Sequence, residues 1–579
     1  MKGKLNILMV TPRIVEEAQG GAEYHAWGLA KSLADRGHRV EIYTTCTGQL
    51  AMASPGYVIW GNHFVPGREE AEGVLVNRFP VRNPRPLQAR KARARVDGRM
   101  RKECGEPSFA RHLARLLEPG QAVLVHGWHG LESWRDGPAR WSAARATIAL
   151  RGEGMTRVAL RLFSPRRQTV KVGDGGGWIC RARLQANEED EVLVEVPGRD
   201  FLALRLESGR AFRQGMDERE LGVALRGIRI LHEPGEVSVG PASDLERFLD
   251  NGAEEAVFEL LTAVAEDRPE PYQRDHDLLV GPDSPALREA LMREAPRYDL
   301  VIATHTPHTT LTMGCEAAHQ AGVPCVALPL FHLRDRYVYW PDTLRRLREA
   351  DRIDSGTPTL ANILGRLGAP AFASGVGLDP EEFGYPESAA LLREKYALGD
   401  GPLLLWVGRK NRRKGYPEAA QAVRLLRERG LEVGLLMVGP EEDGRPAGGG
   451  ETLYLGALPR EELLQAYHAC RLFVLPSRDE SFGISLCEAW LAGKPVLAWR
   501  MCSAARDLVD EGRDGFLCSS AEELADAAEK LLRDPALAER MGRRGREKVL
   551  GRYLWSMVAE LFEEEVVKTL KGGPQAGLA

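Results

Sequence analysis

Two glutamates, Glu480 and Glu488, are separated by seven residues near the C-terminal end of the chain. The apolar run 472–475 precedes Glu480 and predicts a buried strand, whereas helical periodicity follows it up to Leu491. A strand, a polar loop and a helix form a unit of a parallel sheet, and such sheets bind ligands at the carboxyl ends of their strands. Both carboxylates are therefore candidates for contacting a polar ligand. The alternative is that they only complement the dipole of the helix.

Two cations follow a second predicted strand at 403–407, in the stretch Gly408–Gly415. Arg409 offers a planar fork of donors and Lys414 a compact positive charge. Two such cations, held by a glycine turn after a strand, suit the binding of a diphosphate. The alternative is a solvated basic loop.

Two features of the N-terminal half also lie next to predicted strands. Gly20 and Gly21 open a predicted helix, where backbone amides favour phosphate and glycine lets a ligand approach the backbone. The G-x-G-x-x-G spacing of dinucleotide-binding proteins is absent. The apolar strand at 299–304 ends at His305, and His308 follows. Both histidines are candidates for contacting a ligand, although a histidine after a strand is often only part of the loop.

These features occur together with further residues in one order along the chain. The residues concerned are Gly20–Val40, Gly408–Gly415, Glu480, Phe482-Gly483-Ile484, Glu488 and Ala492–Val496. Together they resemble the retaining, sugar-nucleotide-dependent glycosyltransferases of family 4, which have the GT-B fold. The resemblance covers residues 1–65 and 285–555.

The resemblance implies a role for each candidate. Arg409 and Lys414 would bind the diphosphate of the donor. Glu480 would contact the hydroxyls of the donor sugar, and Glu488 those of the ribose. His305, favoured over the histidine three residues later because His-x-Pro fits the motif better, would contact the primary hydroxyl region of the sugar. The remaining predicted donor-binding residues are Gly20, Gly21, Phe482, Gly483 and Ile484.

The resemblance also implies the substrates and the absence of a cofactor. The donor would be a nucleotide diphosphate sugar and the acceptor a glycan or lipid-linked glycan, and neither a metal nor a cofactor is expected. His126 and His129 form an H-x-x-H without further ligands nearby, so no zinc site is predicted. Residues 374–377 read Ser-Gly-Val-Gly where the family usually has Asn-Gly-Val-Asp, which puts the usual polar contacts in doubt.

Length and composition exclude several classes of protein. A chain of 579 residues predicts two to four domains. A net charge of -4 gives no global basic field, so no nucleic-acid partner is predicted. Nine cysteines without a regular spacing suit a reducing compartment, and no apolar run is long enough for a signal peptide or a spanning helix. We therefore predict a cytoplasmic protein.

The predicted fold is α/β: a GT-B fold of two Rossmann-like domains facing a cleft, with an all-β, sandwich-like insertion in the N-terminal domain. Alternating apolar and polar residues predict strands at 157–162, 191–196 and 201–206, and turn signals between them, including Pro197-Gly198, complete the pattern of the insertion. The predicted boundaries are 1–122 and 236–380 for the two parts of the N-terminal domain, 123–235 for the insertion, 381–555 for the C-terminal nucleotide-sugar-binding domain, and 556–579 for a C-terminal helix and tail.

Two surface hypotheses accompany this fold. The basic region 78–102 is interpreted as a solvated helix, with peripheral contact to an anionic membrane as the alternative. Trp134 and Trp141 are interpreted as core residues of the insertion, with a sugar-stacking platform as the alternative. For the whole chain, the alternatives to a glycosyltransferase are a nucleotide-sugar epimerase or hydrolase of the same fold and a non-catalytic glycan-binding protein.

Overall fold

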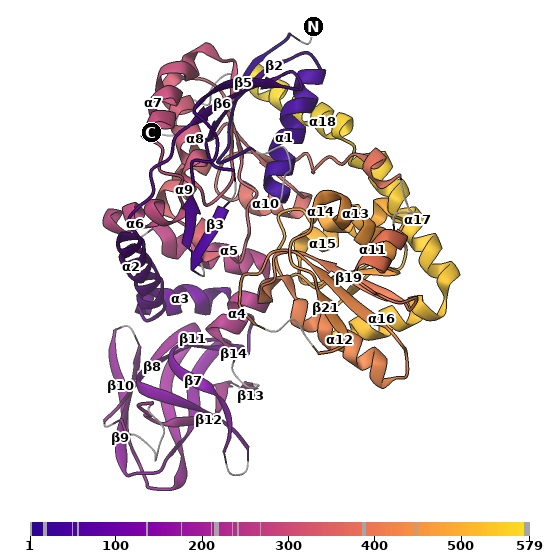
Figure 1. Cartoon of the computed structure of the whole chain (residues 1–579). Helices are drawn as coiled ribbons and strands as arrows, with labels where there is room; N and C mark the ends of the chain where they lie inside the picture. Colours follow the sequence, from indigo (N-terminus) through magenta and orange to yellow (C-terminus); the bar gives the residue numbers. More distant parts are fainter. Residues whose placement is uncertain are drawn as a thin grey trace. The chain divides into compact units, whose positions relative to one another are not determined.

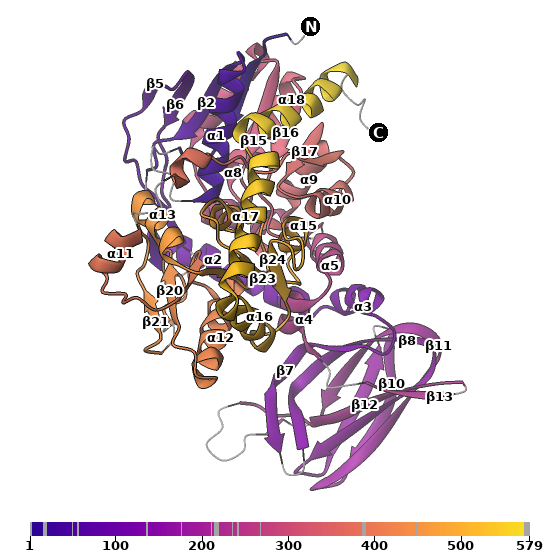
Figure 2. The same ribbon diagram turned by 90° about the vertical axis from the view of Figure 1, so that its right-hand side faces the viewer.

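The computed structural model describes residues 3–14, 20–48, 50–54, 57–134, 137–174, 176–209, 211–212, 219–233, 235–239, 243–266, 268–384, 389–445 and 449–572. The chain forms two compact units, unit 1 (residues 1–92 and 273–579) and unit 2 (residues 93–272). Unit 1 alternates strands and helices, whereas unit 2 is mostly β (Figures 1 and 2).

The N-terminal part of unit 1 contains an eight-stranded sheet in the order β18-β17-β16-β15-β1-β2-β6-β5. Its strands are β1 (Asn6–Val10), β2 (Arg39–Thr45), β5 (Gly67–Ala71), β6 (Val74–Phe79), β15 (Leu300–Thr304), β16 (Cys325–Leu328), β17 (Arg352–Ser355) and β18 (Ala371–Ala373). All neighbouring pairs are parallel except β5 with β6. Because Ile7 lies opposite Leu300, two distant stretches of sequence form the centre of one sheet. A separate hairpin joins β3 (Leu50–Ser54) to β4 (Tyr57–Trp60).

The C-terminal part of unit 1 contains a six-stranded parallel sheet in the order β21-β20-β19-β22-β23-β24. Its strands are β19 (Leu403–Val407), β20 (Gly434–Val438), β21 (Thr452–Tyr454), β22 (Leu472–Leu475), β23 (Val496–Trp499) and β24 (Gly515–Cys518). The strands predicted at 403–407 and 472–475 are confirmed. They are direct neighbours in the sheet, so the loops that follow them lie side by side.

Helices connect the parallel strands of both sheets, as parallel pairing requires. Those of unit 1 are α1 (Gly21–Asp35), α7 (Pro285–Glu294), α8 (Thr309–Ala321), α9 (Pro341–Glu349), α10 (Pro358–Gly365), α11 (Ala389–Lys395), α12 (Tyr416–Glu428), α13 (Arg460–Ala469), α14 (Ile484–Leu491), α15 (Ser503–Leu508), α16 (Ala521–Arg533), α17 (Pro535–Arg552) and α18 (Trp555–Gly572). This architecture confirms the predicted pair of Rossmann-like domains. Within the described residues, no helix has the length and apolar character needed to cross a membrane.

Unit 2 is built on a second eight-stranded sheet in the order β10-β9-β11-β8-β12-β13, with β7 and β14 attached. Its strands are β7 (Ala122–Trp134), β8 (Gly137–Ser164), β9 (Gln168–Asp174), β10 (Gly177–Leu184), β11 (Glu188–Ser208), β12 (Ala224–His232), β13 (Gly235–Val239) and β14 (Ser243–Asp244). Helices α3 (Pro107–Leu116), α4 (Leu245–Asn251) and α5 (Glu254–Glu266) belong to the same unit, and α2 (Pro86–Cys104) and α6 (Glu270–Val280) lie at its borders. One face of the sheet supplies a core of mostly aliphatic side chains, and a second, smaller cluster surrounds Trp141.

The prediction that 191–196 and 201–206 form two separate strands is wrong. Both belong to β11, which pairs with β8 along its length with register shifts between Glu195 and Phe201. Gly198 has φ +69°, and the irregularity at this point lets the strand continue past Pro197. The turn-forming pair Pro197-Gly198 therefore produces a bulge within β11 and does not end the strand.

Trp141 is a core residue of unit 2, as predicted. Its side chain is almost fully buried and packs edge-on against Phe163 and Phe212, with ring centroids 6.2 and 5.8 Å away. The alternative of a sugar-stacking platform at this position is wrong. The side chain of Trp134 lies outside the described residues.

The C-terminal helix α18 packs on the N-terminal sheet although α17, which precedes it, packs on α14 (Figure 2). Trp555 opens α18 and occupies a slot between Gly28 of α1 and Gly377. A Cβ atom built on Gly28 would lie 2.0 Å from the Trp555 ring, and one on Gly377 would lie 2.3 Å from it. Only glycine therefore leaves room for the indole at these two positions.

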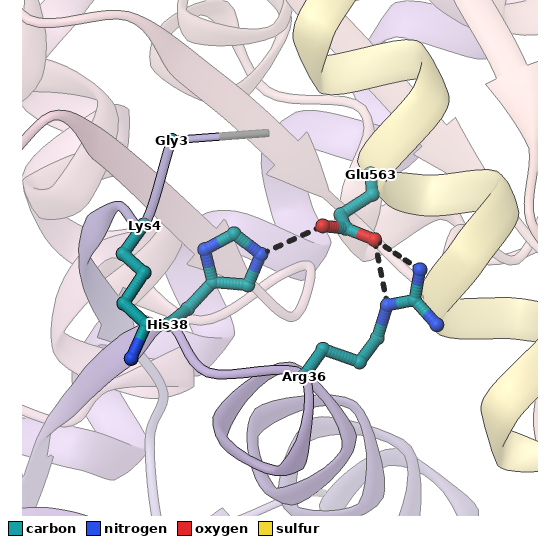
Figure 3. A pocket seen from close by; sticks show the side chains of 5 residues that line it. All are labelled: Gly3, Lys4, Arg36, His38 and Glu563. Atoms are coloured by element: carbon teal, nitrogen blue, oxygen red, sulfur yellow. Dashed lines mark hydrogen bonds and ion pairs between the residues drawn. The ribbon is translucent and has the colours of Figure 1, made fainter. Parts of the chain in front are cut away.

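Helix α18 is also held by an ion-pair cluster at the amino ends of β1 and β2. His38 Nδ1 accepts the Leu5 backbone N–H (3.1 Å), so its other nitrogen, Nε2, donates to Glu563 Oε1 (2.9 Å). Arg36 Nε donates to Glu563 Oε2 at 2.6 Å (Figure 3). The cluster borders a cavity of about 200 Å³ lined by Gly3, Lys4, Arg36, His38 and Glu563. Because it lies at the amino ends of the strands, it is at the opposite edge from the predicted donor-binding residues.

The slot around Trp555 predicts the effect of adding one methyl group. Gly28→Ala should destabilise the chain by ~1–3 kcal/mol, because the new Cβ overlaps the indole in a close-packed site. Thermal unfolding of the purified chain measures this as a lower Tm.

Gly551→Ala is the matched control, since a Cβ at this helical glycine of α17 would meet no atom of the described residues within 4 Å. It should leave the Tm unchanged or raise it slightly. The loss caused by Gly28→Ala should also shrink in a Trp555→Ala background. An equal loss in both backgrounds would show that Trp555 does not cause it.

Candidate functional site

The predicted donor-binding residues of the C-terminal domain come from two neighbouring loops. Glu480 lies in the loop between β22 and α14, and Arg409 and Lys414 lie in the loop between β19 and α12. Gly415 closes the second loop with φ +72°, and a Cβ there would lie 2.0 Å from the backbone oxygen of Pro476. The tight glycine turn therefore lets the two loops touch.

The structure joins Lys414 directly to Glu480. Lys414 Nζ donates to Glu480 Oε1 at 2.6 Å, and both side chains are largely buried. The backbone of Lys414 is fixed on both sides, because its N–H donates to the Asn411 side chain (3.1 Å) and its carbonyl accepts from Trp406 Nε1 (3.0 Å). The sequence predicted a role for each residue but not this ion pair, which is the centre of the candidate site.

The other cations of this loop have separate partners. Arg409 is half-exposed and pairs with Glu442 at 3.1 Å. Lys410 is buried, and its Nζ donates to Glu441 (2.9 Å) and Asp443 (3.0 Å) after β20. Sequence reasoning missed Lys410. The signal that pointed to it was the acidic run Glu441 to Asp443, which is the kind of partner that a buried ammonium needs.

Glu488 is buried in α14, and both of its oxygens have partners from α13. Tyr467 Oη donates to Glu488 Oε2 at 2.7 Å, and the Arg460 guanidinium pairs with Oε1. Arg460 also pairs with Glu382 and lies 5.9 Å from the ring of Tyr24 on α1. The predicted ribose-binding carboxylate thus lies in an ion-pair network that reaches the N-terminal sheet's first helix.

Two helix starts meet beside this network. A Cβ atom on Gly21, the first residue of α1, would lie 2.8 Å from Ile484 Cδ1, the first residue of α14. Gly20 is the N-cap of α1, and Gly483 is the N-cap of α14 with φ +101°. Phe482 is buried and packs edge-on against Tyr553, with ring centroids 5.3 Å apart. The structure therefore brings the predicted glycine pair next to the start of the second helix, where orphan backbone amides of both helices lie.

His305 has an unusual conformation and a free ring nitrogen. Its φ is +71°, which is rare for a residue with a Cβ, and its side chain is buried. Thr304 Oγ1 donates to Val10 O, so it accepts the Nδ1–H of His305 at 2.6 Å. Nε2 has no hydrogen-bond partner among the residues that the structure describes. Burial lowers the pKa of His305 to about 3, so the ring is neutral and Nε2 is an acceptor suited to a ligand hydroxyl.

His308 is occupied by structural contacts. Its Nδ1 donates to Val280 O at 2.8 Å, and its ring packs edge-on against Trp60 at 4.9 Å. Burial also lowers its pKa. Of the two candidate histidines, His305 is therefore the one with a buried ring nitrogen that has no partner among the described residues.

Two acidic residues near the site were missed. Glu23, in the first turn of α1, is buried, pairs with Arg13 and acts electrostatically on His305. Asp479 is buried next to Glu480 and accepts the backbone N–H groups of Leu333 and Arg334, both at 3.1 Å. Glu23 belongs to the Gly-Gly-Ala-Glu motif, which could have identified it, whereas no local pattern marks the partners of Asp479.

The described residues contain no group of three or more His, Cys, Asp or Glu side chains that could hold a metal ion. His129, from the H-x-x-H at 126–129, places Nε2 3.2 Å from the Glu220 carbonyl.

Comparisons with known proteins agree with this geometry in the C-terminal domain. Residues 389–548 match the family model described as glycosyl transferases group 1. Two parallel-sheet domains of the Rossmann type, one of which matches this model, confirm the predicted GT-B fold.

Similar curated proteins are glycosyltransferases of several specificities. The capsular polysaccharide biosynthesis glycosyltransferase CapM of Staphylococcus aureus is 29% identical over 33% of this chain and 53% of its own length. A GDP-mannose-dependent phosphatidylinositol monomannoside mannosyltransferase of Mycolicibacterium smegmatis is 31% identical over 31% of this chain and 51% of its own. The chain thus spans about half the length of these relatives. Among solved structures, HepE of Anabaena with UDP and glucose is 19% identical with a TM-score of 0.44, over 49% of this chain and 82% of its own.

The buried carboxylate of Asp479 predicts a pH dependence of stability. Burial alone would raise the pKa of Asp479, but His332, Arg413 and the Arg334 amide lower it to about 2. Because this pKa lies below the unfolded value near 3.8, the ionised group stabilises the fold above about pH 4 by ~2 kcal/mol. This stabilisation is lost as the pH falls from about 4 to 2.

Asp479→Asn should therefore lower the free energy of unfolding at pH 6, and the difference from wild type should shrink as the pH approaches 3. Urea unfolding at both pH values measures it. Asp526→Asn is the control, because its partner Arg429 and the carboxylate itself are well exposed and the pair should contribute little. A difference for Asp479→Asn that is the same at pH 6 and pH 3 would contradict the assignment.

Proposed function

We propose that the chain is a retaining glycosyltransferase that moves a sugar from a nucleotide diphosphate sugar to a hydroxyl group of a glycan or lipid-linked glycan. The observation that carries this proposal is the buried pair of Lys414 and Glu480 at the carboxyl ends of β19 and β22, inside the segment that matches glycosyl transferases group 1. A cation and a hydroxyl-binding carboxylate at one point suit a ligand in which a phosphate is joined to a sugar.

The reaction needs stabilisation of the negative charge that grows on the departing diphosphate. Lys414 and Arg409 would supply it, helped by the backbone amides at the starts of α1 and α14. When the diphosphate replaces Glu480 as the partner of Lys414, the Glu480 carboxylate can accept hydrogen bonds from the sugar. With two fixed cations, no metal is required in this proposal.

The remaining residues would orient the two ends of the donor. Glu488, rigidly held by Tyr467 and Arg460, would accept hydrogen bonds from the ribose hydroxyls. His305 Nε2 would accept one from the sugar. Retention would follow from attack on the same face that the diphosphate leaves, with a phosphate oxygen receiving the proton of the acceptor.

The partners and location belong to the same proposal. The relatives include a GDP-mannose-dependent enzyme and one of capsular polysaccharide biosynthesis, which supports a nucleotide-sugar donor and a glycan acceptor. A cytoplasmic protein with peripheral membrane contact through 78–102 fits a lipid-linked acceptor. In that region Arg93 pairs with Asp97 and Arg99 with Glu103, which reduces the charge available to a membrane.

Release of nucleotide from UDP-, GDP- and ADP-sugars tests the proposal. One donor should be turned over by the wild type in the presence of an acceptor mixture. Lys414→Ala should lower kcat/KM for that donor by roughly 100-fold, as expected for loss of a charge that stabilises the transition state. Glu480→Gln should lower it as well.

Lys494→Ala is the matched control, because Lys494 is tied to the His468 carbonyl (2.9 Å) outside the candidate site. It should leave the turnover unchanged. Nucleotide release that does not need an acceptor would favour the hydrolase alternative. If no nucleotide is released from any of these donors and none of the nucleotides raises the Tm, the donor-site assignment would be overturned and the glycan-binding alternative favoured.

The two histidines give a second, separate prediction. His305→Ala should lower kcat/KM by about tenfold, the cost of one lost hydrogen bond of ~1.5 kcal/mol to the sugar. His308→Ala should change donor turnover little once the fraction of folded protein is matched, because His308 Nδ1 already donates to the Val280 carbonyl. A larger loss for His308→Ala would reverse the assignment.

A further inference from the structure

Unit 2 exposes a tryptophan on the outer face of its sheet. Trp178 of β10 is 42% exposed, which is high for so large an apolar side chain. Two cations approach its ring: the guanidinium carbon of Arg205 lies 4.4 Å from the ring centroid and Lys171 Nζ lies 5.3 Å from it. An indole and two cations thus lie together on three strands, β9, β10 and β11. Figure 1 shows these strands in unit 2.

The register of the strands explains why these side chains meet. Trp178 lies opposite Gly173, and Gly173 lies opposite Arg205 on its other side, so all three positions share one face. A Cβ on Gly173 would lie 2.1 Å from the Gly177 carbonyl, so no side chain fits between the indole and the guanidinium. The glycine keeps the space above β9 open.

Several cationic side chains lie near Trp178 on this face, and two of them share one carboxylate. Lys171 and Arg145 share Glu207, both at 3.3 Å. Along the same face, Arg181 and Arg183 lie opposite Lys171 and Thr169. Within the described part of the chain, Arg181, Arg183 and Arg205 form no ion pair, and Arg205 Nε has no hydrogen-bond partner.

The fold of unit 2 does not need this feature. The opposite face of the same strands supplies the core, with Val170, Val172, Leu204 and Leu206 almost fully buried. An exposed aromatic ring beside unpaired guanidinium groups is therefore available to a ligand.

We propose that this surface, defined by Trp178, Arg205, Lys171, Arg181 and Arg183, binds a carboxylate-bearing polysaccharide. The flat indole can pack against the apolar face of a sugar ring, and a guanidinium fork matches a carboxylate. A single tryptophan on a chain of net charge -4 favours this partner over a nucleic acid, which would use several stacking rings and a wider basic field. The choice of a glycan rests on the proposed function, since the surface would hold the chain that the transferase extends or modifies.

Binding of polygalacturonate to the full-length chain tests the proposal, with neutral dextran as the comparison and no donor present. The wild type should bind polygalacturonate, more weakly as the salt concentration rises, and should not bind dextran. Arg205→Gln should weaken the binding about tenfold, because it removes charge-assisted hydrogen bonds. Trp178→Ala should weaken it as well, with an unchanged Tm as the check on folding.

Glu207→Gln gives a change in the opposite direction. Removing the shared carboxylate frees Lys171 and Arg145, so affinity for polygalacturonate should increase, which a general loss of folding cannot mimic. Arg543→Ala, an exposed arginine of α17 in unit 1, is the matched control and should bind as the wild type does.

Glu480→Gln separates the two proposals, because it should lose donor turnover and still bind polygalacturonate normally. Unchanged binding by both Trp178→Ala and Arg205→Gln would overturn the surface assignment, even if donor turnover is intact. Equal binding of dextran, or tighter binding of a single-stranded oligo(dT), would overturn the assigned class of ligand.

Discussion

The position of Glu480 depends on one buried charge, that of Asp479. Its carboxylate accepts two backbone N–H groups from the loop after β16, at 333–334, while its own backbone belongs to the loop after β22. An ionised carboxylate cannot remain buried without such donors, so the two loops must stay together for either to be stable. The next residue in the chain is Glu480. The geometry of the candidate sugar-binding carboxylate is therefore fixed by a contact between two loops, one from each sheet of unit 1.

In the proposed function, the pairing of Lys414 with Glu480 makes donor binding an exchange of partners. In the absence of a ligand, each group neutralises the other at 2.6 Å, which allows both to be largely buried. A diphosphate presents more negative charge to Lys414 than one carboxylate does. Displacement of Glu480 from the ammonium would then coincide with the arrival of sugar hydroxyls that need an acceptor. The pair would thus keep both groups oriented before the ligand binds. Binding would then have to break the contact between them.

The sequence predicted the elements of the site better than its contacts. Apolar runs identified β19 and β22, and the glycine turn at Gly415 identified the loop between β19 and α12, because these depend on local spacing. The partners of Asp479 lie 145 and 146 residues away in the sequence, so no local pattern reveals them. Those of Lys410 lie 31 and 33 residues away, and the acidic run Glu441 to Asp443 is the signal for them. The continuous strand β11 was missed for a different reason: Pro197 and Gly198 have turn propensity, but sheet pairing on both sides of them prevails.

The altered segment Ser374–Gly377 is accommodated by packing. The Ser374 hydroxyl and backbone N–H donate to Asp354 at 2.6 and 3.0 Å, so this position keeps a polar contact of its own. Gly377 has no side chain because the Trp555 ring occupies that space. The same indole closes against Gly28 of α1, which begins at the glycine pair of the candidate site. The departure from the usual motif therefore reflects how α18 packs on the N-terminal sheet. It does not favour the alternative of a non-catalytic glycan-binding protein.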